Sequence, residues 1–91
     1  MTPTLHIITQ PDDQLALDAI AREPSHATIL LLQDGVYTGV EAPSRRTPVG
    51  ARVFAGEADV RARGLDCPYQ LIDDAAVVDL IVEHDRVICW H

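Results

Sequence analysis

The feature that most constrains the fold is an apolar run in the first half of the chain, residues 27–32 (Ala-Thr-Ile-Leu-Leu-Leu). A strand with one face in water alternates apolar and polar residues, whereas a strand covered on both faces does not. The run is also far shorter than the roughly 20 apolar residues that span a membrane. It therefore predicts a central strand over residues 28–32, in a parallel sheet with helices on both faces.

Shorter apolar segments on either side predict further strands and helices in alternation. Hydrophobic periodicity and turn residues place strands at 5–9, 28–32, 51–55, 69–72 and 86–90, and helices at 14–22, 57–63 and 75–84. Alternating strands and helices are typical of a mostly parallel sheet between two helical layers. We expect one domain over residues 1–91, a three-layer α/β/α sandwich with about five strands.

Capping residues support these helix boundaries. Asp12 or Asp13 is expected to cap the first helix, and the pair Asp73-Asp74 the last, because carboxylates accept hydrogen bonds from free N–H groups. Gly64 is expected to end the middle helix in a left-handed conformation. Residues 36–50 contain Gly39, Pro43 and Pro48, which leave room for one or two helical turns and a loop carrying Arg45 and Arg46.

The charge balance excludes several function classes. The chain has 14 acidic residues against 7 arginines, no lysine, and a net charge of −7. This argues against direct binding to nucleic acid or to anionic membranes. Without lysine there is no Schiff-base chemistry and no lysine-type phosphate loop. The two cysteines make no disulfide framework and no secretory leader is visible, so we expect a cytoplasmic protein.

The candidate site follows the central strand at Gln33-Asp34-Gly35, with Val36 and Tyr37 next to it. In open α/β sheets, ligands and partners meet the carboxyl ends of strands. These residues are therefore expected at a partner interface. The alternative is that Asp34 caps the next turn and Gly35 bends the backbone.

Other chemically active residues show weaker patterns. Cys67 lies in a loop before a strand, and a sulfur-carrying thiol needs a cation, a metal or a helix N-terminus that favours the thiolate. It is thus a weak catalytic candidate or a passive loop residue. Cys89 is expected in the core, and Trp90 either in the core or as an interface anchor. The four histidines (His6, His26, His84, His91) lack metal-ligand spacing, so neither metal nor cofactor is expected.

Four segments of the sequence resemble the DsrH/TusB family over nearly the whole chain. They are Leu5-His6, the run Leu30-Leu31-Leu32-Gln33-Asp34-Gly35-Val36-Tyr37, the run Val60-Arg61-Ala62-Arg63-Gly64-Leu65, and the end at Trp90. The resemblance implies a DsrE-like fold in a cytoplasmic sulfur-relay subunit. It further implies a dimer of heterotrimers with TusC/DsrF-like and TusD/DsrE-like chains. In the Tus branch such a complex passes persulfide sulfur from a small carrier toward 2-thiolation of tRNA wobble uridine; in the Dsr branch it serves sulfur oxidation.

One departure from the family bears on mechanism. Some members carry a cysteine in the first helix, proposed as a sulfur acceptor, but residues 15–22 here contain none. We therefore expect a non-catalytic Tus-type subunit. Three alternatives stay open: a DsrH-type subunit in cytoplasmic sulfur oxidation, a small sulfurtransferase that uses Cys67, and a homo-oligomer that binds a small ligand at Asp34-Gly35.

Overall fold

The structure is a computed structural model that describes residues 4–23, 27–38 and 51–90. Its core is a five-stranded, wholly parallel sheet in the order β4-β3-β2-β1-β5. The strands are β1 (Leu5–Ile8), β2 (Thr28–Leu31), β3 (Arg52–Gly56), β4 (Gln70–Ile72) and β5 (Val87–Trp90). As the apolar run predicted, β2 is the middle strand, and all four of its residues are buried.

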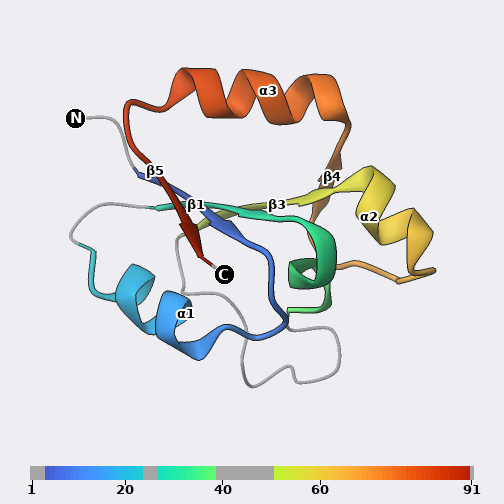
Figure 1. The fold of residues 1–91 in the computed structure, drawn as a ribbon, viewed down its shortest axis with the longest axis horizontal. Coiled ribbons are helices and arrows are strands. Elements are labelled where there is room, and N and C mark those ends of the chain that lie inside the picture. The colour runs from blue at the N-terminus through green and yellow to red at the C-terminus, as the bar shows by residue number, and fades with distance from the viewer. Residues whose placement is uncertain (1–3, 24–26, 39–50, 91) are drawn as a thin grey trace.

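Helices cover both faces of the sheet (Figure 1). They are α1 (Gln14–Ala21), the short 3-10 helix η1 (Gln33–Tyr37), α2 (Glu57–Ala62) and α3 (Asp74–Glu83). From β1 to β4 each strand is added beside the previous one, and then the chain returns across the sheet to place β5 beside β1. Because right-handed crossovers reverse sides when the direction reverses, α3 lies on the opposite face from α1.

Each face of the sheet has its own hydrophobic core. Ile8, Ile29 and Leu31 point to the α1 face and pack in a cluster with Leu17 of α1 and Val60 of α2. The alternating strand positions point to the other face, where a smaller cluster joins α3 to the sheet (Leu5, Ile7, Leu30, Leu80). The three-layer α/β/α fold class is therefore confirmed, and in the described part of the chain one of the helical layers consists of α3.

The predicted caps are present. Asp13 accepts a hydrogen bond from the Ala16 N–H at 3.1 Å, and Asp73 accepts one from the Ala76 N–H at 2.8 Å. Gly64 has φ +62°, and the Leu65 N–H reaches back to the Val60 carbonyl at 3.2 Å. This is the Schellman arrangement that left-handed glycine permits. The expected helical turn after the central strand is η1, while the expected loop with Arg45 and Arg46 lies outside the described residues.

One sequence-based prediction about the fold is wrong. Cys89 was expected in the core, but its side chain is exposed. It lies on edge strand β5, in register with Ile7 and hence on the α3 side of the sheet. Among the described residues α3 is the one helix on that side, and the outermost strand is left open to solvent.

Candidate functional site

The turn at the carboxyl end of β2 packs directly on the end of β1. The Leu32 N–H donates to the Ile8 carbonyl at 3.0 Å, and the Gly35 N–H then donates to the Leu32 carbonyl at 2.9 Å. Gln33 has φ 52°, a left-handed conformation that non-glycine residues adopt at some cost. This sharp reversal leads the chain from β2 into η1.

The close approach of η1 to the end of β1 requires a glycine at position 35. A Cβ at Gly35 would lie 2.0 Å from the Ile8 carbonyl oxygen and 2.7 Å from its carbon, far inside van der Waals contact. The left-handed position of this turn is Gln33 and not Gly35, which lies within η1. Gly35 instead lets η1 seat against β1.

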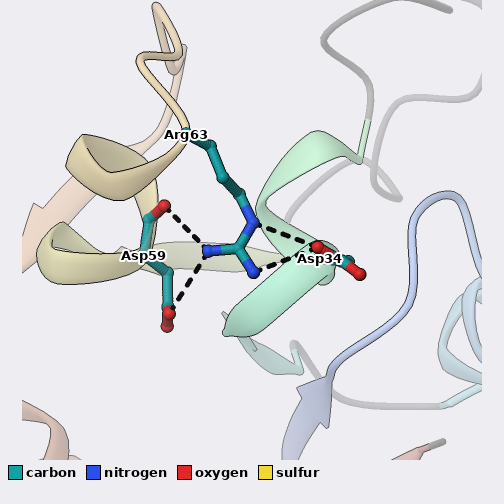
Figure 2. A network of polar contacts seen from close by, with 3 residues as sticks. All are labelled: Asp34, Asp59 and Arg63. Atoms are coloured by element: carbon teal, nitrogen blue, oxygen red, sulfur yellow. Dashed lines mark hydrogen bonds and ion pairs between the residues drawn. The ribbon is translucent and has the colours of Figure 1, made fainter.

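Asp34 forms an ion pair with the end of α2. Arg63 donates from Nε and Nη2 to Asp34 Oδ1, both at 3.0 Å. From its other amino group, Nη1, it donates to the Asp59 carbonyl at 3.1 Å and lies 3.5 Å from Asp59 Oδ1 (Figure 2). The alternative that Asp34 caps η1 is wrong, because η1 begins after Leu32 without a side-chain cap.

The Asp34–Arg63 contact joins two of the segments on which the family resemblance rests. Nothing in the sequence pairs Asp34 with Arg63, which is 29 residues away. The pairing follows from the sheet, since β2 and β3 are neighbours and η1 and α2 follow their carboxyl ends. The motif residues around Asp34 and Arg63 thus form one local structure.

The residues predicted at the interface differ in what they can present to a partner. Gln33 and Asp34 are exposed and Tyr37 is half-buried, whereas Gly35 and Val36 are buried. Any contact made by this turn would therefore use the side chains of Gln33, Asp34 and Tyr37.

Trp90 belongs to a polar network at the carboxyl end of β5. Its indole N–H donates to His6 Nδ1 at 3.0 Å, and the two rings stack with centroids 6.2 Å apart. His6 Nε2 lies 2.6 Å from Glu23 Oε1. Because an indole only donates, His6 Nδ1 must accept, and its proton is then on Nε2, where it is donated to Glu23. Trp90 is half-buried and packs against the core of the α1 face.

Two other candidate residues, Cys67 and His84, pack within the fold. Cys67 is half-buried and packs against the core of the α1 face. His84 is buried and bridges α3 to β2: Nδ1 donates to the Leu80 carbonyl at 2.7 Å, which leaves Nε2 to accept from Thr28 Oγ1 at 3.3 Å. Within residues 4–23, 27–38 and 51–90, no group of histidine, cysteine and acidic side chains could hold a metal ion.

Together these features define a small parallel α/β sandwich with a surface turn at the carboxyl end of β2 that hydrogen bonds and an ion pair hold in place. A model of the DsrH-like protein family matches residues 10–87, and the chain belongs to that family. No curated protein matches the sequence. Across the described part of the chain, no helix is long and apolar enough to cross a membrane.

Proposed function

We propose that this protein is a non-catalytic, cytoplasmic subunit of a TusBCD-type complex that relays persulfide sulfur toward 2-thiolation of tRNA wobble uridine. The family match over residues 10–87 carries the proposal, because DsrH/TusB proteins are sulfur-relay subunits. The partners would be one TusC/DsrF-like and one TusD/DsrE-like chain, assembled as a dimer of heterotrimers and served by a small sulfur carrier.

The placement of the thiols supports a non-catalytic role. The helix in which some relatives carry a cysteine, α1, has none. Cys67 packs against the core and Cys89 lies exposed on an edge strand. No hydrogen bond or ion pair to either thiol is seen in the described ranges, and such a partner is what activates a sulfur-carrying thiolate. The sulfur acceptor would then belong to the TusD-like partner.

The turn after β2 is the proposed contact with a partner subunit. Gln33, Asp34 and Tyr37 would supply side chains, Gly35 and Val36 would hold the turn against β1, and Trp90 would border the surface at the end of β5. The ion pair with Arg63 supports this role because it fixes the exposed Asp34 in position before a partner arrives. A preformed surface loses less conformational entropy on binding.

The test is to co-express the chain with the two homologous subunits and purify by a tag on one of them. We expect a stable complex from the wild type and from a Cys67→Ser/Cys89→Ser variant. In a strain without the gene, both proteins should restore 2-thiouridine at the wobble position, measured by nucleoside mass spectrometry.

The alternatives give different results in the same strain. Restoration of sulfur oxidation, with no change in 2-thiouridine, would indicate the Dsr branch. A sulfur atom added to Cys67 of the isolated chain, with loss of relay in Cys67→Ser, would instead make this chain a sulfurtransferase. Gln33→Ala should weaken subunit association, and Gln10→Ala, another exposed glutamine, is the matched control.

A further inference from the structure

Helix α3 is apolar on two opposite sides, although the chain covers only one of them. Leu80 and Val77 face the sheet. On the outside, Val78 is 58% exposed, Ile81 37% and Val82 78%. A surface helix normally keeps polar residues on the side that faces away from the core. Valine and isoleucine are also poor helix formers, so helix propensity does not explain their presence here.

The exposed side chains form a continuous ridge. Residues three and four apart are neighbours on a helix surface. Val78 and Val82 therefore lie together on the side away from the sheet, and Ile81, four residues from the sheet-facing Val77, borders them on the flank of the helix. In Figure 1 this side of α3 faces solvent along its whole length, with no other element above it. We call these three residues the α3 ridge.

A groove with an acidic wall runs beside the ridge, between α3 and strands β3 and β4. Its apolar lining comes from Phe54, Ile72 and Leu80, and its acidic wall from Asp79 and Glu83. Asp79 and Glu83 are one helical turn apart, a spacing at which like charges repel. Neither carboxylate has an ion pair among the described residues.

The negative charge near the ridge indicates which kind of partner would bind there. Helix α3 contains three carboxylates (Asp74, Asp79 and Glu83) and no basic residue. The groove also holds the guanidinium of Arg52, which lies 5.3 Å from the centre of the Phe54 ring. Two carboxylates against one guanidinium still leave the groove negative. A second copy of this chain would bring the same carboxylates and a net charge of −7 against this surface.

We propose that the α3 ridge docks a helix of a different protein, one with an apolar stripe flanked by lysine or arginine. The stripe would cover Val78, Ile81 and Val82, and the basic side chains would reach Asp79 and Glu83. Amphipathic helices bind apolar surfaces in this way, through anchors spaced three and four residues apart. That the partner is a relay subunit rests on the proposed function. That it carries an apolar stripe with basic flanks is inferred from the residues of the ridge and the groove.

The first test uses a defined probe, a fluorescein-labelled amphipathic peptide with a leucine stripe flanked by lysines, measured by fluorescence anisotropy. We expect saturable binding at one peptide per chain. Val78→Ser/Val82→Ser should weaken it at least about tenfold, from the loss of apolar contact. Asp79→Asn/Glu83→Gln should weaken it roughly fivefold and reduce its salt dependence, as for exposed ion pairs.

Matched controls separate the ridge from general attraction to an acidic protein. Leu15→Ser changes an apolar side chain on α1 that is 74% exposed. Asp18→Asn/Asp66→Asn makes the same change in net charge away from α3. Both should bind the peptide as the wild type does. Equal weakening by the controls, or equally tight binding of a peptide with glutamates in place of lysines, would overturn the proposal.

The second test uses the co-expressed complex and separates this inference from the proposed function. If the wild-type complex forms and Val78→Ser/Val82→Ser removes the partner from it, the relay role and the ridge proposal are both supported. If the complex survives the ridge variants, the ridge proposal is wrong and the relay role stands. If no complex forms but the lysine peptide binds the ridge, the relay role is wrong. A wild-type dimer in sedimentation equilibrium that the ridge variants dissolve would make the occupant a second copy and refute the proposal.

Discussion

Replacing Gly35 by alanine tests whether the turn after β2 is set by contact with β1. The new Cβ would lie 2.0 Å from the Ile8 carbonyl oxygen, and real contacts of this kind are not shorter than 3.0 Å. The turn must therefore move by at least the difference, 1.0 Å. Because the Ile8 carbonyl also accepts the Leu32 N–H, the movement weakens the hydrogen bonds that begin η1.

The expected loss of stability follows from these two effects. Overpacking against a fixed backbone costs about 1–3 kcal/mol, and each weakened hydrogen bond costs about 1 kcal/mol. With two hydrogen bonds weakened, from the Leu32 N–H and the Gly35 N–H, Gly35→Ala should lower the free energy of unfolding by about 3–5 kcal/mol, roughly half of what a chain of this size has. The corresponding decrease in Tm is roughly 12–40 °C, at 4–8 °C per kcal/mol.

The assay is urea unfolding followed by the fluorescence of Trp90, the single tryptophan, with Tm from circular dichroism. Gly64→Ala is the control, since its Cβ would meet no atom within 4 Å but its φ is +62°. That variant should lose only about 1–2 kcal/mol from the left-handed conformation. If Gly35→Ala costs no more than Gly64→Ala, the contact with Ile8 does not determine the turn.

Substitutions at three further positions test other parts of the structure by the same unfolding measurements. Leu80→Ala should cost about 3 kcal/mol, because Leu80 is the one buried side chain that α3 inserts into its core; a loss below that of an exposed-site control would place α3 elsewhere. Asp73→Ala should cost about 1 kcal/mol as a lost N-cap, whereas Asp73→Asn should cost little, and equal losses would argue against capping. Trp90→Phe should cost about 1–3 kcal/mol, because His6 Nδ1 would stay buried without a hydrogen-bond donor. Unfolding of this variant is followed by circular dichroism, and a smaller loss would mean that water reaches His6.

The local structure was predictable from the sequence because its causes are local. The caps at Asp13, Asp73 and Gly64 depend on residues two to four positions away, and the alternation of strands and helices depends on the apolar pattern within each segment. The unbroken run at β2 correctly indicated a strand with both faces covered. The family resemblance, carried by short motifs at matching spacing, agrees with the match over residues 10–87.

The position of the candidate site was predicted from the sequence, but the contacts that build the site were not. The turn at Gln33-Asp34-Gly35 was expected at the end of the central strand, where it lies, but the contacts of Asp34 and Gly35 within the fold were not predicted. Asp34 pairs with Arg63 and Gly35 avoids the Ile8 carbonyl. Both contacts join segments far apart in the sequence, so no local pattern reveals them.

By itself, the sequence determined the elements of this protein, its acidic surface and the absence of a thiol from α1. Only the tertiary structure decided which surfaces stay open. The return of the chain from β4 to an edge position beside β1 places α3, and no other helix of residues 4–23, 27–38 and 51–90, on one face of the sheet. Cys89 and the α3 ridge are exposed on that face. Periodicity identifies apolar residues, but burial depends on the order of the strands, which non-local pairing in the sheet sets.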